Sequence, residues 1–488
     1  MNAKRTEERL PSPWVSAVPL AVLTVLLYVV IRCFGGDAIN GGSQIALLSA
    51  TSVCVMLAIG IYRCKWAVLE EAIIDNIRAS ASAIIILLLI GAIAGSWMVS
   101  GVVPTMIYYG LKILHPSFFL VASCAICAGV SLMTGSSWTT IATIGVALMG
   151  IGQAMGFPEG WIAGAIISGA YFGDKISLLS DTTVLASSTV GVPIFTHIRY
   201  MLYTTVPSFV IALAVFVIAG LTLDHTGGTH AGMYAESLRG TFRITPWLLA
   251  VPVATGVLIV RKLPAIVTLF CAAVFACIAM LLAQPELVAK VAGVGGLDFM
   301  SGFKGVLMSC FGPTAIPTGS PQLDELVATR GMAGMLNTVW LIICAMCFGG
   351  VMTGSGMLGA LTSVFLRFVR RAFSAVASTV GAGIFFNLCT ADQYISIILS
   401  GRLFRELYAR RGLEERLLSR SVEDSATVCS VLVPWNSCGM TQATVLGVST
   451  FVYMPYCIFN IVSPLMSLAV AAIGWKIKRA AGSAAHPH

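Results

Sequence analysis

The chain has 488 residues, of which 57% are hydrophobic and only 10% are charged. A typical soluble domain carries about 25% charged residues, so this composition excludes a water-soluble protein. The formal net charge of +8 does not indicate nucleic-acid binding, because the basic residues lie in short connections between apolar runs, as the positive-inside bias of membrane proteins predicts. The sequence therefore predicts an all-α polytopic membrane protein embedded in a lipid bilayer.

Apolar runs close to the length that crosses a bilayer, about 20 residues, recur along the chain. The clearest cover residues 14–31, 44–61, 83–98, 203–223, 265–283 and 451–475. With the shorter and interrupted runs between them, we expect roughly ten to thirteen crossings. The first run is interpreted as a spanning helix, because no small-residue cleavage site of a signal peptide closes it before Arg32.

Groups of basic residues predict which helix ends face the cytoplasm. These groups are Arg63 with Lys65, the arginines at 402, 405, 410, 411, 416 and 420, and Lys476 with Lys478 and Arg479. We therefore expect residues 1–10 to form a cytoplasmic N-terminal tail and residues 476–488 to form a C-terminal tail.

Five of the 21 acidic residues stand apart from the others. Most lie in termini, polar connections or the ends of apolar runs. The five that interrupt or border apolar runs are Asp174, Asp181, Asp392, Glu423 and Asp424. An ionisable group at membrane depth costs several kcal/mol unless it faces a cavity or a partner, so these five are candidate functional groups. The alternative, that some of them mark helix ends at the membrane interface, remains open.

The first interruption predicts a re-entrant helical hairpin. An apolar stretch over residues 118–133 is followed by residues 134–140, where six small or hydroxyl residues surround Trp138, and then by a second apolar stretch over 141–155. Irregular backbone is tolerated at membrane depth only where it lines a cavity or is buried in protein. The hairpin is expected over about residues 118–155, with its tip inside the bilayer.

The next interruption predicts a broken helix over about residues 161–190. The apolar run 161–172 stops at Gly173, and polar residues follow as far as Thr183. A broken helix presents free carbonyl and N–H groups, an arrangement found at the ion sites of transporters. Two carboxylates and several hydroxyls line this break, and hard cations such as Na⁺ prefer oxygen ligands.

The second half of the chain repeats these features in the same order. It predicts a second hairpin over about residues 374–405 and a second broken helix over about 421–447. Corresponding positions lie at a nearly constant separation of about 250 to 260 residues. The pairs are Gly95 with Gly354, Ser137 with Thr390, and Asp174 with Asp424. Such repeats are often inverted in transporters, with the site at their interface, so we expect inverted repeats.

These features divide the chain into parts. The first half with repeat 1 covers residues 11–223, and the second half with repeat 2 covers residues 332–475. Residues 224–331 are expected to connect the halves through additional transmembrane helices.

Four stretches carry a family resemblance. They are GSWMVSGVVPTMIYYG at 95–110, TGSSWTTIATIGVALMGIG at 134–152, SGAYFGDKISLLSDTTVLAS at 168–187 and SVEDSATVCSVLVPWNSCG at 421–439. On these motifs the chain resembles the NhaC family of Na⁺/H⁺ antiporters, within the ion transporter superfamily. The resemblance implies a scaffold domain plus a transport domain built from the hairpins and broken helices. It also implies a homodimer in the cytoplasmic (inner) membrane of a prokaryote, with elevator-like movement of the transport domain.

The resulting hypothesis is Na⁺/H⁺ exchange by competition, in which Na⁺ and H⁺ occupy one carboxylate cluster alternately. Asp174 and Asp181 are expected as the main sites, and Asp424, Asp392 and Glu423 as further coupling carboxylates. The expected Na⁺ ligands are Ser137, Asp174, Asp181, Thr390 and Asn436. Further candidate contacts are Ser136, Thr139, Lys175, Ser177, Thr182, Thr183, Asn387 and Ser437. Lys175 is expected either to neutralise Asp174 or to extend to the interface. No cofactor is expected besides the transported Na⁺.

Three alternatives remain open. The same fold is compatible with a Na⁺- or H⁺-coupled carrier of a small organic acid, such as malate or lactate, or of an amino acid, since NhaC relatives include such carriers. An intramembrane enzyme is disfavoured, because the six histidines show no ligand spacing and no H-E-x-x-H motif occurs. A channel is disfavoured, because two broken helices in a repeat favour alternating access.

Overall fold

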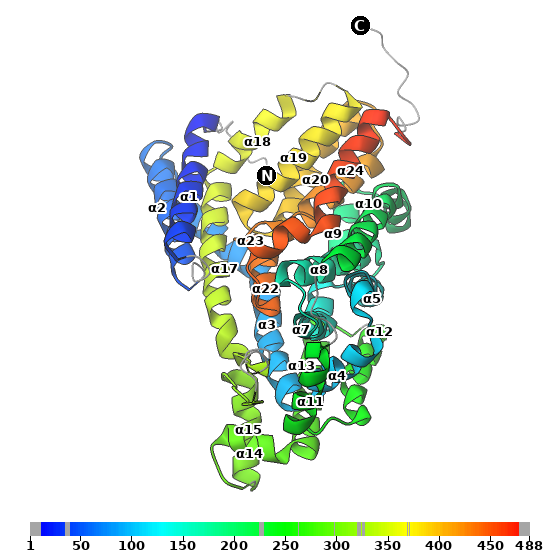
Figure 1. Ribbon diagram of the computed structural model, residues 1–488. Helices are drawn as coiled ribbons and strands as arrows, with labels where there is room; N and C mark the ends of the chain where they lie inside the picture. The colour runs from blue at the N-terminus through cyan, green and yellow to red at the C-terminus, as the bar shows by residue number, and fades with distance from the viewer. Residues whose placement is uncertain are drawn as a thin grey trace.

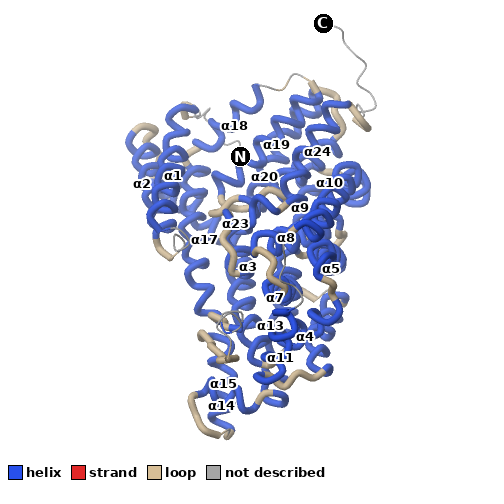
Figure 2. Tube along the Cα trace, in the orientation of Figure 1, coloured by secondary structure: helices blue, strands red, loops and turns tan. Residues whose placement is uncertain are grey.

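The computed structural model describes residues 11–34, 40–223, 229–261, 263–296, 298–319, 324, 327–367, 369 and 371–477. Within these ranges the chain is helical almost throughout and contains no strand (Figures 1 and 2). One isolated β-bridge joins Thr314 and Thr329. The predicted all-α class is confirmed. The expected tail at 1–10, and Lys478 and Arg479 of the other tail, lie outside the described residues.

The helices follow one another through short connections. The first half contains α1 (Pro13–Phe34), α2 (Gly42–Gly60), α3 (Trp66–Val99), α4 (Val102–Ile113), η2 (Pro116–Phe118), α5 (Phe119–Thr134), α6 (Ser137–Thr140), η3 (Ile141–Gly145), α7 (Val146–Ala154), α8 (Glu159–Ile176), α9 (Asp181–Val190) and α10 (Ile194–Thr222). The connection contains α11 (Thr229–Thr241), η4 (Pro246–Leu249), α12 (Ala250–Val260), α13 (Ala265–Ala283), α14 (Pro285–Ala292) and α15 (Phe299–Phe311). The second half contains α17 (Gly331–Gly354), α18 (Met357–Arg367), α19 (Ala372–Thr390), α20 (Gln393–Arg410), α21 (Glu415–Val422), η5 (Glu423–Thr427), η6 (Ser430–Leu432), α22 (Ser437–Leu446), α23 (Thr450–Tyr453), η7 (Met454–Tyr456) and α24 (Ile458–Ile473).

Eight of the described helices are long and apolar enough to cross a membrane, or up to 11 spans if each of three bent pairs counts as one. The upper figure falls within the expected range. The apolar run over residues 451–475 is one of these bent pairs, because the chain bends by 55° between Tyr456 and Ile458. Pro455, at the start of η7, explains the break, since proline fixes the backbone and removes a hydrogen-bond donor.

The helices pack around two hydrophobic cores (Figure 1). The first core takes buried side chains from α4, α5, α7, α8 and α13. The second takes them from α1, α2, α17, α19, α20 and α21. The broken helices join the two cores, because α8 packs in the first and α9 in the second, whereas α21 packs in the second and α22 contributes to the first. The helix breaks therefore lie where the cores meet.

Tight packing at glycines positions the first hairpin on the first broken helix. A side chain at Gly169 or Gly173 of α8 would overlap the backbone of α5 at Cys124 or Ala128. These glycines are four residues apart and so lie on one face of the helix, the small-residue spacing that lets membrane helices approach closely. The last turn of α8 is thereby held against α5, the first helix of the hairpin.

One end of the molecule collects most of the basic groups predicted to face the cytoplasm. The Ser12 N–H, just before α1, donates to the Tyr62 hydroxyl beside Arg63. At the same end, Arg411 donates to the Val369 carbonyl, and the Tyr200 hydroxyl donates to the Lys476 carbonyl.

Arg420 departs from this prediction. Its side chain is fully buried, because α21 turns inward and carries the residue beside Asp424. It therefore does not mark the cytoplasmic surface.

The two halves match in their helix caps. Thr134 and Thr390 each hydrogen-bond the backbone carbonyl two residues on, and each also contacts a hydroxyl six residues on. A left-handed residue follows in both, Gly135 and Ala391. The next residue caps a helix in both, Ser136 before α6 and Asp392 before α20.

The caps of the two broken helices lie the same number of residues apart in the sequence as the caps at the two hairpin tips. Ser180 caps α9 and Asn436 caps α22, and both helices end at a left-handed glycine. At this separation Asp174 corresponds to Ser430, not to Asp424. The pairs expected from sequence, Ser137 with Thr390 and Asp174 with Asp424, are therefore out of register. The order of the features is as predicted, whereas the inverted orientation of the repeats remains a prediction.

Candidate functional site

The tip of the first hairpin meets the break of the first broken helix. Gly135 ends α5 with a left-handed φ of 65°, a conformation that glycine adopts without steric penalty. A Cβ atom on Gly135 would lie 2.6 Å from the carbonyl carbon of Leu179 in the break. The tip and the break are thus close enough for their polar groups to form one site.

Asp174 is the carboxylate at this junction. It lies near the C-terminal end of α8 and is only 6% exposed. Ser137 donates to its Oδ2 twice, from the backbone N–H at 3.1 Å and from the hydroxyl at 2.8 Å. Its Oδ1 is buried and has no hydrogen-bond partner among the described residues. One oxygen is therefore held by the hairpin tip, and the other is free to accept a cation or a proton.

Some hydroxyl groups around Asp174 bond to other hydroxyls at the hairpin tip and at the start of α9, and others bond to backbone carbonyls of the break. Ser136 accepts from the N–H and the hydroxyl of Thr139, which shapes the hairpin tip. Ser180, which caps α9, exchanges a hydrogen bond with the Thr182 hydroxyl at 2.9 Å and interacts with Asp174. By contrast, the hydroxyls of Ser177 and Thr183 donate to backbone carbonyls of Leu132 and Lys175. Those two residues hold the break in shape.

Asp181 occupies a different environment from Asp174. It is the first residue of α9 and its side chain is exposed. Its Oδ2 accepts a hydrogen bond from the Tyr394 hydroxyl of α20 at 2.8 Å, and its Oδ1 accepts from the Thr182 N–H at 2.9 Å. The charges of Asp181 and Asp174 interact. Asp181 therefore lies at the edge of the site and links the first broken helix to the second hairpin.

The second hairpin and the second broken helix form a corresponding polar group. Asp392 is 1% exposed and caps α20 through the Ile395 N–H at 3.0 Å. Its Oδ2 makes longer contacts with the hydroxyls of Ser80, at 3.5 Å, and Ser437, at 3.4 Å. The Ser437 N–H donates to the Ala391 carbonyl at 2.8 Å, which joins this tip to this break.

Three other predicted residues of the second repeat are engaged in the backbone framework. Asn436 donates to the Asn387 side-chain oxygen at 3.1 Å, and Asn387 donates to the Ala426 carbonyl at 2.8 Å. Thr390 bonds the Phe386 and Asp392 carbonyls. These side chains orient the break, and no hydrogen bond within the described residues joins the expected Na⁺ ligands Thr390 and Asn436 to Asp174.

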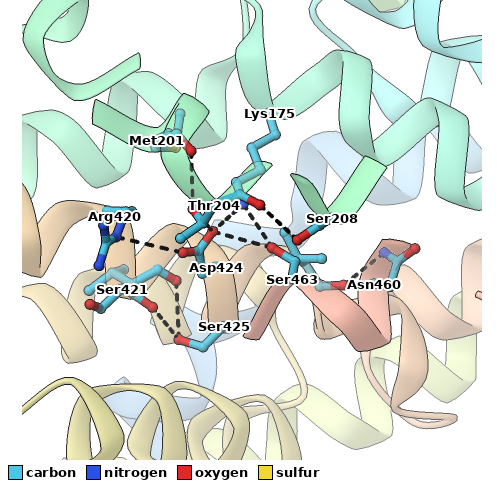
Figure 3. Close-up of polar contacts among 12 residues, drawn as sticks. Lys175, Met201, Thr204, Ser208, Arg420, Ser421, Asp424, Ser425, Asn460 and Ser463 are labelled. Carbon is cyan, nitrogen blue, oxygen red and sulfur yellow. Dashed lines mark hydrogen bonds and ion pairs between the residues drawn. The ribbon is translucent and has the colours of Figure 1, made fainter. Parts of the chain in front are cut away.

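Lys175 and Asp424 form an ion pair at the centre of the molecule (Figure 3). Both side chains are buried, at 1% and 0% exposure. The same Asp424 oxygen accepts from the hydroxyls of Thr204 and Ser463, each at 3.2 Å. Arg420 lies on the other side, 4.0 Å from Oδ2. Lys175 thus neutralises Asp424, not Asp174, and it does not extend to the interface.

This ion pair changes the expected role of Asp424. The residue lies within the π-helical segment η5 and not at the helix break, which begins after Leu432. Lys175 and two hydroxyls lie on Oδ1, whereas Oδ2 has Arg420 at 4.0 Å and no hydrogen-bond partner among the described residues. In this conformation Asp424 is thus the anion of a buried ion pair.

A cavity of about 860 Å³ lies between the helices α1, α7, α17 and α22. Its lining includes Leu27 near the C-terminal end of α1 and the exposed residues Glu159 and Arg330. Since the N-terminal end of α1 is at the basic end of the molecule, the cavity opens at the opposite end. It reaches Pro434 and Trp435, which lie within the second helix break.

Several residues of these polar groups were missed from sequence. They are Ser80, Ser180, Tyr394, Thr204, Ser463 and the buried Arg420. Ser180 lies inside the predicted break, between Ser177 and Asp181, so its position was a usable signal. Ser80, Thr204 and Ser463 lie in ordinary helical runs, where a single serine or threonine is common and gives no signal.

The site offers oxygen ligands only. No group of three or more His, Cys, Asp or Glu side chains able to hold a metal ion occurs within the described ranges. A carboxylate with one unpaired oxygen, next to hydroxyls and free helix-end groups, suits a weakly bound monovalent cation or a proton. Such an arrangement is typical of a transporter for small ions.

Comparison with known proteins agrees with this assignment. A family model described as "Na+/H+ antiporter family" matches residues 169–475. The antiporter NhaC of Alkalihalophilus pseudofirmus is 35% identical over 86% of this chain and 89% of its own length. The malate-2H⁺/Na⁺-lactate antiporter of Bacillus subtilis is also 35% identical, over 89% of this chain and 88% of its own length. The arginine/ornithine antiporter ArcD of Halobacterium salinarum is 33% identical over 96% of this chain and 94% of its own length.

The chain belongs to the Na⁺/H⁺ antiporter family. It is a multi-pass transporter of the cytoplasmic membrane, and it is not an enzyme. The resemblance to NhaC expected from sequence is thereby confirmed.

Proposed function

We propose that the protein exchanges Na⁺ for H⁺ across the cytoplasmic membrane, with Asp174 as the cation-binding carboxylate. The observation that carries this proposal is the buried Oδ1 of Asp174, which has no hydrogen-bond partner in the described structure. An ionised carboxylate oxygen without a partner is costly in an apolar interior, so it gains most from a cation or a proton. Ser137, Ser180 and the backbone of the break supply neutral oxygens nearby.

The cavity supports alternating access. Its lining reaches Trp435, whose indole N–H donates to the Leu388 carbonyl at 2.8 Å. A carrier needs access from one side at a time, and a permanently open path would dissipate the gradient. We further propose that the hairpins and broken helices move as an elevator against the remaining helices, within a homodimer, as the family resemblance implies.

The test is proton movement driven by Na⁺ in proteoliposomes that contain a pH-sensitive dye. Asp174→Asn removes the negative charge and keeps the shape, so we expect it to abolish Na⁺-driven proton movement. Asp75→Asn is the matched control, since Asp75 forms only an exposed pair with Arg78. Wild-type activity in Asp174→Asn, at equal amounts of protein, would contradict the proposal.

A second candidate function is exchange of a small organic acid or amino acid, coupled to Na⁺ or H⁺. The observation in its favour is the size of the cavity, about 860 Å³, which reaches the size of typical small-molecule sites. Two relatives, 35% and 33% identical to this chain, are named for organic solutes. Counterflow of labelled malate, lactate or arginine tests this function, since a pure cation antiporter shows no such counterflow.

A further inference from the structure

Glu423 is a buried carboxyl group for which the fold supplies no structural bond. It is 0% exposed, and neither carboxylate oxygen has a hydrogen-bond partner within the described part of the chain. It opens the five-residue π-helical segment η5, and such segments within α-helices often occur at functional sites. Thr427, four residues on, faces Glu423, but its hydroxyl does not meet hydrogen-bond geometry. Glu423 is therefore neither a helix cap nor one half of a structural bridge.

The nearby cations are directed at another carboxylate. Lys175 contacts Asp424 and donates to the Ser463 hydroxyl at 2.9 Å. Arg420 has its closest acidic partner in Asp424, at 4.0 Å, and its guanidinium stacks over the Tyr200 ring at 4.8 Å. Figure 3 shows Lys175 and Arg420 on opposite sides of Asp424. Both positive charges thus compensate Asp424 first.

The other elements packed against η5 bring no compensating charge. By sequence, α19, α24 and η6 contain no charged residue, and α9 contains only Asp181, at its exposed start. In α20 the charged residues are exposed, from Arg402 onward, apart from Asp392 at its cap. His197 of α10 is engaged through Nδ1 with the Ser419 hydroxyl at 2.9 Å.

An ionised Glu423 would therefore be a buried anion without a hydrogen-bond partner among the described residues. Burying an unpaired carboxylate costs several kcal/mol, whereas the protonated group is a neutral side chain. Because the ionised group would have no hydrogen-bond partner among the described residues, burial favours Glu423 in the protonated form in this conformation.

We propose that Glu423 is the proton-carrying group, at a site separate from the cation site at Asp174. This inference rests on the proposed Na⁺/H⁺ exchange. The proton binds a carboxylate oxygen of Glu423 and leaves to water when the group ionises, so no covalent bond of the chain changes. Asp174 and Glu423 directly precede Lys175 and Asp424, the two residues of the buried ion pair, so the two carboxyl groups belong to one buried region and Na⁺ at Asp174 favours the ionised form of Glu423. The two ions then exclude each other by repulsion between neighbouring sites and not by occupying one carboxylate.

Two transport measurements distinguish the proton site at Glu423 from the cation site at Asp174. Exchange of external ²²Na⁺ for internal Na⁺ requires only the cation site, whereas Na⁺ uptake driven by a pH gradient requires both sites. For Glu423→Gln we expect Na⁺/Na⁺ exchange within about twofold of wild type at saturating Na⁺, and pH-driven uptake reduced about tenfold or more. Glu415→Gln, with an exposed side chain on α21, is the matched control and is expected to retain both fluxes.

The outcomes are distinguishable. Full pH-driven uptake in Glu423→Gln overturns the inference, and so does loss of both fluxes in a variant that purifies as well as Glu415→Gln. If Asp174→Asn retains both fluxes, the proposed function itself fails, whatever Glu423→Gln shows.

A measurement on the wild-type chain does not depend on the folding of any variant. Addition of Na⁺ is expected to remove an infrared band of a protonated carboxyl group. That band is expected to shift when glutamate carries ¹³C in its side-chain carboxyl, because the carrier is a glutamate. A Na⁺-sensitive band that is unmoved by the label, or no such band, overturns the inference.

Discussion

The two repeats share a framework and differ in their charges. Ser136 and Asp392 cap matching helices, and so do Ser180 and Asn436. The residues inside this framework are different, because Asp174 of the first repeat corresponds to Ser430 of the second. Ser137 contacts Asp174, and its counterpart Gln393 accepts from the Ser430 hydroxyl at 2.8 Å. The comparison teaches that the architecture is common to both repeats, whereas Asp174, the proposed cation-binding carboxylate, has no carboxylate counterpart in the second repeat.

The largest expected effect comes from breaking the Lys175–Asp424 pair, which has no counterpart in the opposite repeat. Lys175→Met leaves Asp424 as a buried anion that has lost its closest cation, and loss of one partner of a buried pair costs about 3–5 kcal/mol. We expect a large fall in the unfolding temperature of the detergent-solubilised protein. Lys175→Met combined with Asp424→Asn should recover much of that loss, and no recovery would contradict the assignment of the pair.

A smaller effect should separate the two hairpin tips. Gly135 and Ala391 both have left-handed backbone, with φ of 65° and 56°. Gly135→Ala adds about 1–2 kcal/mol of backbone strain and places its Cβ against Leu179, so both stability and transport should fall. Ala391→Gly relieves strain at the matching position, and its unfolding temperature should be equal to or above that of wild type. Equal changes in the unfolding temperature of the two variants would contradict the proposed correspondence of Gly135 and Ala391.

The smallest effect is expected at the exposed edge of the first site. Asp181 is exposed and bonded to Tyr394, and an exposed charge interaction contributes only about 0–1 kcal/mol. Asp181→Asn should raise the Na⁺ concentration for half-maximal exchange by about two- to threefold, without abolishing exchange. Complete loss of exchange would show that Asp181 is a direct ligand, as the sequence-based hypothesis has it.

The sequence was informative where local chemistry determines local structure. The hydroxyl-rich stretch 134–140 and the polar stretch 173–183 cannot continue a membrane helix unaided, so the hairpin and the first break were predictable. Asp174 was identifiable because a carboxylate beside such a break is costly without a function.

The partners of the buried charges could not be predicted, because they depend on how distant segments pack. Lys175 precedes its partner Asp424 by half of the chain, and no local pattern favours that pairing over one with Asp174 beside it. Arg420 continues a row of surface arginines, and only the inward turn of α21 buries it. The repeat register failed for a related reason, since the halves share caps and helix lengths but few residues.

The central claim is that the first repeat alone holds the cation, and direct binding tests it most simply. Binding of ²²Na⁺ to the purified protein is measured for wild type, Asp174→Asn and Ser430→Ala. We predict saturable binding by wild type and Ser430→Ala, and no saturable binding by Asp174→Asn. Wild-type binding by Asp174→Asn, or its loss in a well-folded Ser430→Ala, would contradict the account.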